Sequence, residues 1–134
     1  PATPARPRGP ASRFAGLPEF VGYYLRPIIG GRKTQGIHGY NGVDLAISCG
    51  QPVLATAPGQ VIISKSTGWN TGYGKYTAIS HPNNTQSLYA HMSKVFVEVG
   101  QAVTQGDAIG LIGSTGRSTG CHVHFEIRGA RNPF

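Results

Sequence analysis

The segment Cys121-His122-Val123-His124-Phe125-Glu126 alternates polar and apolar side chains, which is the pattern of a β-strand with one face in a hydrophobic core. Successive side chains of a strand point to opposite faces, so both imidazoles are expected on one face and Val123 and Phe125 on the other. Two imidazoles that line one groove are compatible with metal binding or proton transfer. They are also compatible with ordinary hydrogen bonding on a half-exposed strand.

A histidine and an aspartate precede another alternating run. His38 lies in the Gly-rich stretch 36–42, and Asp44 stands at the start of a strand predicted over residues 43–47. By itself, a carboxylate at a strand start beside a histidine can be only a turn or capping residue. Together with the His-x-His pair it completes a set of two histidines and one carboxylate. Such a set leaves a coordination position open, as catalytic zinc sites do.

The other two histidines have different settings. His91 ends a short strand pattern that runs from Ser87 to His91. His81 begins the turn sequence His81-Pro82-Asn83-Asn84 and is expected at the surface.

Three separated motifs of this chain resemble those of the lysostaphin-like zinc metallopeptidases, which cleave peptide bonds in bacterial peptidoglycan. The motifs are His38 with Gly42-Val43-Asp44, then Leu88-Tyr89-Ala90-His91, and finally His122-Val123-His124-Phe125-Glu126. The similarity extends from about Gly30 to Arg128. It implies a mainly β, single-domain fold with very little helix, built on an antiparallel β-sheet groove of the lysostaphin-like, duplicated hybrid type.

The resemblance also implies a metal centre and its catalytic residues. The implied ligands of one zinc ion are His38, Asp44 and His124, and the implied catalytic residues are His91 and His122. Zinc lowers the pKa of a bound water to about 7, while the two free imidazoles can activate that water, stabilise the oxyanion and protonate the leaving amine. The sequence leaves the division of these tasks open. Glu126, on the same strand face, either orients a histidine or belongs to a structural salt bridge.

The first motif departs from the family pattern in two ways. Five residues separate His38 from Asp44, where the family usually has three, and Gly39 and Asn41 make a longer turn feasible. Some family members carry a transition-state tyrosine just before the first ligand, where this chain has Arg32-Lys33.

The length of 134 residues and the composition indicate one compact domain. Residues 1–17 are rich in proline and are expected to form a flexible linker or tail, so the catalytic domain is assigned to residues 18–134. Short alternating runs between turn residues predict an antiparallel sheet. The predicted strands are two within 53–64 and others at 76–80, 87–91, 101–103, 108–113 and 122–128.

Cys49 and Cys121 are predicted to form a disulfide, because the strands beside them must both reach the metal. The alternative is a pair of buried thiols in a reducing compartment. A disulfide and the family resemblance favour a secreted protein in an extracellular, cell-wall or periplasmic setting. No apolar run is long enough to span a membrane. Since the sequence begins without methionine and ends abruptly, the chain is expected to be a piece of a longer protein with further domains. It is also expected to be a monomer.

The net charge of +7 could indicate a nucleic-acid partner, but the basic residues are scattered and form no basic helix or stacking platform. Nucleic acid is therefore not expected as a partner, and bacterial peptidoglycan, which the family resemblance implies, is an adequate anionic partner for this charge. The Gly-rich segment 113–120 fails the P-loop pattern because Leu111 and Arg117 occupy its glycine and lysine positions. In the loop over residues 66–74, Trp69 and Tyr73 could form a wall of a peptide cleft.

Three function classes follow from these observations. The leading one is an active zinc endopeptidase of peptidoglycan. The alternative is a catalytically inactive relative that binds wall peptides or regulates another hydrolase, against which the completeness of the five site residues argues. The third is a lipoyl or biotin carrier, suggested by residues 99–110, but no lysine with the expected flanking residues is found at a protruding hairpin. The sequence leaves open which peptidoglycan bond is cut.

Overall fold

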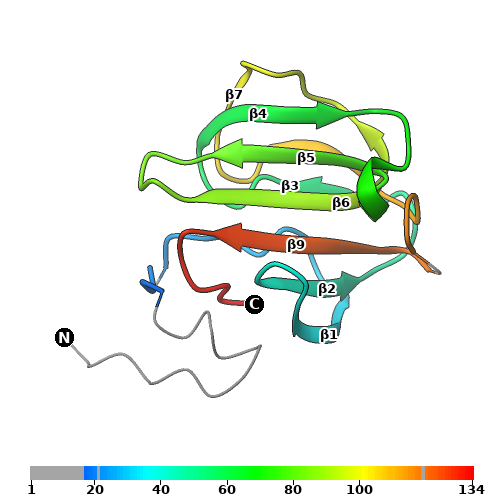
Figure 1. The fold of residues 1–134 in the computed structure, drawn as a ribbon, viewed down its shortest axis with the longest axis horizontal. Coiled ribbons are helices and arrows are strands. Elements are labelled where there is room, and N and C mark those ends of the chain that lie inside the picture. The colour runs from blue at the N-terminus through cyan, green and yellow to red at the C-terminus, as the bar shows by residue number, and fades with distance from the viewer. Residues whose placement is uncertain (1–16, 21, 119) are drawn as a thin grey trace.

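A single antiparallel sheet dominates the computed structural model, which describes residues 17–20, 22–118 and 120–134 (Figure 1). The linker predicted over residues 1–17 lies, apart from Leu17, outside the described residues. Within those ranges no α-helix occurs, and Asn70–Gly72 forms a 3₁₀ turn. The prediction of a mainly β fold with very little helix is confirmed. In the described part of the chain no helix has the length and apolar character that crossing a membrane requires.

The strands agree with most of the predicted runs. They are β1 (Arg32–His38), β2 (Gly42–Ala46), β3 (Pro52–Leu54), β4 (Gly59–Lys65), β5 (Lys75–Ser80), β6 (Gln86–Val95), β7 (Ala102–Val103), β8 (Ala108–Ile112) and β9 (His122–Arg128). No sequence pattern indicated β1, because its residues are almost all exposed and carry no apolar alternation. β6 continues four residues beyond the predicted end at His91, for a reason that concerns the site.

The strand that carries the His-x-His pair lies inside the sheet. The strand order is β1-β2-β9-β6-β5-β4-β7, and β8 joins both β3 and β6. Figure 1 shows β9 between β2 and β6. In this register Asp44 of β2 and Ala90 of β6 both lie opposite His124. The sheet therefore brings three separated sequence motifs to one place.

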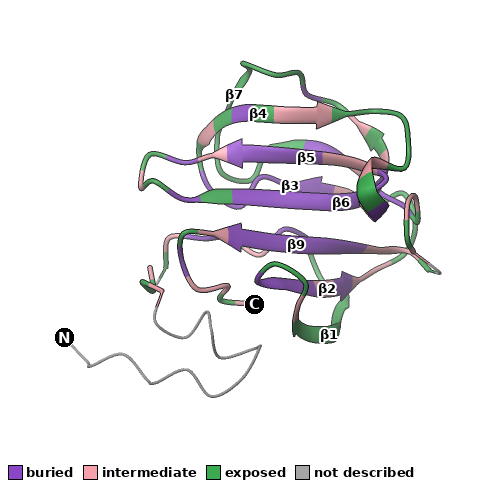
Figure 2. Cartoon of the chain, viewed as in Figure 1, coloured by how far each residue is buried: buried purple, intermediate pink, exposed green. Residues whose placement is uncertain are grey.

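The opposite face of these strands forms the hydrophobic core. Val123, Phe125 and Ile127 of β9 are fully buried, as the alternation predicts. Figure 2 shows most of β9 as buried. Phe125 packs against Tyr89 of β6, with 5.3 Å between the ring centroids. Burying one such side chain contributes about 1.5 to 3 kcal/mol, so the core face fixes which way the histidines of β9 point.

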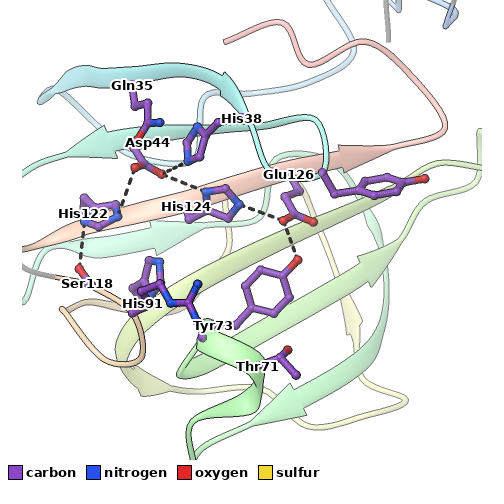
Figure 3. Close-up of a pocket in the computed structure, with 14 residues that line it drawn as sticks. Gln35, His38, Asp44, Thr71, Tyr73, His91, Ser118, His122, His124 and Glu126 are labelled. Carbon is purple, nitrogen blue, oxygen red and sulfur yellow. Dashed lines mark hydrogen bonds and ion pairs between the residues drawn. The ribbon is translucent and has the colours of Figure 1, made fainter. Parts of the chain in front are cut away.

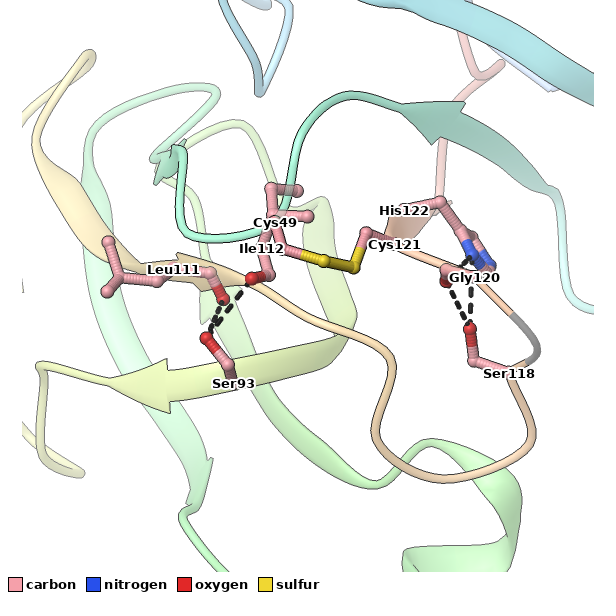
Figure 4. Close-up of a disulfide and its surroundings, with 8 residues drawn as sticks. All are labelled: Cys49, Ser93, Leu111, Ile112, Ser118, Gly120, Cys121 and His122. Carbon is pink, nitrogen blue, oxygen red and sulfur yellow. Dashed lines mark hydrogen bonds between the residues drawn. A yellow bond between two sulfur atoms is a disulfide. The ribbon is translucent and has the colours of Figure 1, made fainter.

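A disulfide joins Cys49 to Cys121, as predicted (Figure 4). The two Cα atoms are 5.3 Å apart and the residues are separated by 72 positions in the sequence. Closing a loop of this length stabilises the fold by about 4 kcal/mol in the chain-entropy model. Because Cys121 directly precedes His122, the bond also holds the end of β9 that carries this histidine.

The expectation that His81 is a surface residue is wrong. Its turn forms, with the backbone N–H of His81 donating to the carbonyl of Thr85, but the imidazole points inward and is only 4% exposed. There Nδ1 donates to the carbonyl of Pro58 and Nε2 accepts from the hydroxyl of Ser87, each at 2.8 Å. Burial lowers the pKa of His81, although the bond to Pro58 opposes the shift. Pro58 and Ser87 both lie outside the turn sequence, so the turn motif did not reveal them.

A directional chain of hydrogen bonds keeps His81 neutral. The N–H of Thr56 donates to the hydroxyl of Tyr89 at 2.9 Å, which leaves the Tyr89 proton to donate to Ser87 at 2.7 Å. The Ser87 proton then points at Nε2 of His81. A proton on Nε2 would face the Ser87 proton, so protonation would break this chain.

We expect His81 to make folding sensitive to acid. Above the unfolded pKa of about 6.5 the residue is neutral in both states and its bonds stabilise the fold fully. As pH falls from there toward the lowered folded pKa, the unfolded chain takes up a proton first, so this stabilisation is lost. The parent chain should therefore exceed His81→Leu in free energy of unfolding at pH 7.5, and the difference should narrow at pH 5. Urea titrations at both pH values measure it, and a constant difference would contradict the expectation.

Candidate functional site

The polar face of β9 forms part of a pocket of about 550 Å³. All five residues predicted for the site line this pocket, and Figure 3 shows them converging from β1, β2, β6 and β9. They are His38, Asp44, His91, His122 and His124. The structure therefore brings together every sequence-predicted site residue.

Asp44 is at the centre of the cluster. Its Oδ1 lies 2.9 Å from Nδ1 of His124 and 3.2 Å from Nε2 of His38, and its Oδ2 lies 3.6 Å from Nε2 of His122. Burial alone would raise the pKa of Asp44, but the hydrogen bond to His124 and the nearby imidazoles lower it. Asp44 is thus a carboxylate at neutral pH.

The outer ring nitrogens of His38 and His124 define which atoms face Asp44. Nδ1 of His38 donates to the carbonyl of Gly36 at 2.7 Å, and Nε2 of His124 donates to the carboxylate of Glu126 at 2.9 Å. In the neutral rings, lone pairs therefore remain on Nε2 of His38 and Nδ1 of His124. These two nitrogens and an oxygen of Asp44 lie within 4.8 Å of one another.

Three acceptors that converge without a donor between them fit a divalent cation. Two imidazole nitrogens and one carboxylate oxygen are a ligand set typical of catalytic zinc, with a coordination position left open. When no cation is bound, His124 can carry a second proton. Burial lowers the pKa of His124, but the bonds to Asp44 and Glu126 outweigh burial and raise this pKa to about 9. The same electrostatic environment that favours this proton favours a metal ion.

Gly42 makes room for the ring of His124. A Cβ atom at this position would lie 2.5 Å from Cε1 and 2.7 Å from Nε2 of that ring. Because real Cβ atoms do not approach so closely, a side chain here would displace the imidazole. This contact explains why glycine occurs two residues before Asp44.

The longer first motif is accommodated by a tight turn, as expected. Gly39 and Asn41 both adopt positive φ, at 56° and 52°. The buried side chain of Asn41 holds the turn in place by donating to the carbonyls of Ile127 and Ala130, each at 2.8 Å. His38 therefore reaches Asp44 despite the two extra residues.

His91 reaches the pocket through a β-bulge. Strict alternation from Tyr89 in the core would turn His91 toward the core as well. Instead β6 contains one extra residue relative to β5 between Tyr89 and Met92, and His91 has a φ of 64°. The bulge turns the imidazole into the pocket, and Nδ1 then donates to the carbonyl of Thr115 at 2.7 Å. The strand was predicted to end at His91, and the structure has this bulge there instead of an end.

His91 and His122 form a pair of imidazoles beside Asp44. Their ring centroids are 4.9 Å apart. Nδ1 of His122 lies 3.0 Å from the carbonyl of Gly120, to which it donates, and 3.2 Å from Oγ of Ser118. Burial lowers the pKa of His91 and the neighbouring His122 adds to this effect, although the Thr115 carbonyl opposes it. His91 is therefore neutral at pH 7, with a proton-accepting Nε2.

Glu126 has both of the roles that the sequence left open. Its Oε2 accepts from His124 at 2.9 Å and from the hydroxyl of Tyr73 at 2.6 Å, while its Oε1 forms an ion pair with Arg128 at 3.0 Å. Burial and Glu126 raise the pKa of Tyr73 to about 12, so this phenol keeps its proton. Arg128 also stacks over the ring of Tyr40, 4.4 Å from its centroid.

Sequence reasoning overlooked Arg128, Tyr40 and Ser118. Arg128 could have been found, because it lies two positions beyond Glu126 on the same strand face. Ser118 and Tyr40 could not, because both belong to irregular segments whose position no alternation predicts.

Comparison with known proteins agrees with this geometry. Residues 38–134 match Peptidase family M23. The peptidoglycan DD-endopeptidase ShyA of Vibrio cholerae is 38% identical over 94 residues, which are 70% of this chain and 21% of ShyA. The chain thus spans only about a fifth of the length of this curated relative.

Solved structures with the same fold include two peptidases. The antimicrobial peptidase lysostaphin from Staphylococcus simulans superposes with a TM-score of 0.67 and 31% identity, covering 76% of this chain and 44% of lysostaphin. A zinc-containing peptidase from Vibrio cholerae superposes with a TM-score of 0.61 and 34% identity, covering 84% of this chain and 35% of that one. The lysostaphin-like fold expected from the sequence is confirmed.

Proposed function

The chain belongs to peptidase family M23, and from that premise we propose that it is a zinc-dependent endopeptidase that hydrolyses peptide bonds in bacterial peptidoglycan. The observation that carries this proposal is the convergence of three ligand atoms beside two further imidazoles, each of which has its Nδ1 bonded to a backbone carbonyl. The names of ShyA and of the zinc-containing peptidase support the substrate and the metal, respectively.

The proposed ligands are His38, Asp44 and His124, whose facing atoms are acceptors in one small volume. A zinc ion held there would supply a nucleophilic water of lowered pKa and a Lewis acid for the scissile carbonyl. Glu126 fixes the ring of His124 by accepting from its outer nitrogen, and Gly36 does the same for His38. The protein therefore holds both histidine ligands in the tautomers that metal binding needs.

His91 and His122 are the proposed catalytic residues. The carbonyl oxygens of Thr115 and Gly120 hold a proton on Nδ1 of each ring, so each neutral ring has a lone pair on Nε2. Either Nε2 can accept the proton of the attacking water, and the resulting imidazolium can stabilise the oxyanion and protonate the leaving amine. Two imidazoles at 4.9 Å between centroids can serve the two sides of one scissile bond.

We assign the catalytic domain to residues 18–134, although the family match begins at residue 38. The segment before β1 is bonded to the rest of the domain. Pro18 accepts from the N–H of Arg131 and Pro27 from that of Leu54, both at 2.8 Å, and Ile28 is buried in the core. Removing this segment would expose core side chains.

The setting that fits this function is extracellular, cell-wall or periplasmic, and the disulfide supports it. Peptidoglycan is the proposed partner. The chain itself is proposed to be one domain of a longer protein, as its relative ShyA is longer. One chain supplies all five site residues to the pocket, so the domain needs no second copy to act and is proposed to be a monomer. The alternative is that the chain is catalytically inactive and only binds wall peptides or regulates another hydrolase. A single experiment decides between the active and the inactive chain.

Digestion of defined cross-linked muropeptides tests the proposed function. We expect the zinc-loaded chain to cleave each of them into two products whose summed mass exceeds that of the parent peptide by one water, and a chelated sample to leave them intact. Mass spectrometry of the products also identifies the bond that is cut. A zinc-loaded, folded chain that binds the muropeptides without cleaving any of them would establish the inactive alternative.

A further inference from the structure

Arg117 is a pocket-lining cation that forms no ion pair with a carboxylate of the described residues. The two acidic residues that line the same pocket, Asp44 and Glu126, are already engaged. Asp44 is surrounded by histidines, and Glu126 bonds to His124, Tyr73 and Arg128. The positive charge of Arg117 is therefore available to a ligand.

The backbone of Arg117 is held firmly in the pocket wall. Its N–H donates to the carbonyl of Gly72 at 2.7 Å, which ties the loop after β8 to the 3₁₀ turn. The two loops pack so closely that a Cβ at Gly74 would lie 2.5 Å from the backbone nitrogen of Gly116. Glycine at both positions allows this contact, which fixes where the Arg117 side chain begins.

The side chain of Arg117 is also positioned by its surroundings. It runs beside Gly72, where a Cβ would lie 3.4 Å from Cβ and 3.7 Å from Nε of Arg117. The guanidinium carbon lies 5.9 Å from the ring centroid of Trp69. This cation–π contact leaves the N–H groups at the edge of the guanidinium free to donate. Arg117 is exposed, so its guanidinium can meet a planar acceptor that enters the pocket.

A carboxylate is the ligand that this arrangement fits. Guanidinium binds carboxylate through two parallel hydrogen bonds, which are stronger than neutral ones. Ser118, the next residue, contacts His122, so a carboxylate held by Arg117 belongs to a molecule that occupies the catalytic pocket. Stem peptides of peptidoglycan carry free carboxylates beside their cross-links, whereas a bridge of glycine residues is neutral.

We propose that Arg117 recognises a free carboxylate of the substrate, so that the enzyme prefers carboxylate-bearing stem-peptide cross-links over neutral bridges. This inference rests on the proposed function and adds the substrate class to it. Arg117 is a specificity-determining residue. The reacting bond is cleaved without its participation.

The test compares two synthetic cross-linked peptides that differ only in one group beside the scissile bond, a carboxylate or its carboxamide. The readout is the ratio of their kcat/KM values, with KM and kcat determined separately. For the parent chain we expect the carboxylate peptide to be favoured about 10- to 100-fold, mainly through KM. In Arg117→Gln this ratio should fall toward one. Arg117→Lys should keep only part of it, because lysine lacks the planar fork.

Lys65→Gln is the matched control, since it removes one positive charge from an exposed position on β4 and should keep the parent ratio. Equal hydrolysis of both peptides by the parent chain would overturn this inference while the proposed function stands. An unchanged ratio in Arg117→Gln would overturn it too. Failure of the zinc-loaded parent chain to cleave either peptide would overturn the proposed function and this inference with it.

Discussion

Asp44→Ala is expected to abolish zinc binding at stoichiometric concentration and, with it, all measurable hydrolysis of peptidoglycan peptides. Asp44 contributes the only carboxylate oxygen among the three converging ligand atoms, and its charge attracts the cation. Removing a residue that hydrogen-bonds to a metal ligand typically costs about 10- to 100-fold in metal affinity. Removing a ligand itself should therefore cost more than about 100-fold. Metal analysis after dialysis, together with activity across added zinc, measures both effects.

Asp107→Ala is the matched control for this prediction. Asp107 is an exposed aspartate whose carboxylate accepts from the N–H and the hydroxyl of Thr104 within a turn, and it does not line the pocket. The same substitution there should leave one zinc per chain. Full zinc content in Asp44→Ala would remove Asp44 from the ligand set. Hydrolysis that persists in that variant without zinc would refute the metallopeptidase mechanism.

The central part of the site could be predicted from local sequence because strand geometry is regular. Alternation along 122–128 placed His122, His124 and Glu126 on one face, and the structure confirms that β9 covers these residues. The apolar residues between them are fully buried, so a shift by one position would put histidines in the core. Similar regularity explains why Asp44 was found on the groove side of β2.

The rest of the site depends on contacts that no local pattern encodes. His91 lies on the groove face because of a bulge whose position depends on how β6 pairs with both β5 and β8. His81 has an ordinary turn sequence, yet Pro58 and Ser87 hold its ring in the interior. The family resemblance predicts His91 at the site and its ring does line the pocket, but only the fold explains how its backbone achieves that position.

His91→Ala and His122→Ala are each expected to keep zinc but to lose about 10²- to 10⁴-fold in kcat/KM, the range typical of a general acid or base. Neither residue belongs to the three that converge as ligands, and each has its Nδ1 proton fixed by a carbonyl oxygen. Ser118→Ala should cost much less, about five- to tenfold, because the carbonyl of Gly120 still orients His122.

The double variant of His91 and His122 tests whether the two rings act as one unit. Both line one pocket and their ring centroids lie 4.9 Å apart, so we propose that they serve the same proton transfers. Groups that act together show strongly non-additive losses. We therefore expect the double variant to be only a few-fold slower than the worse single variant. Losses that multiply in full would assign the rings to independent steps. Parent-like hydrolysis by either single variant, with zinc content equal to that of the parent, would withdraw that histidine from catalysis.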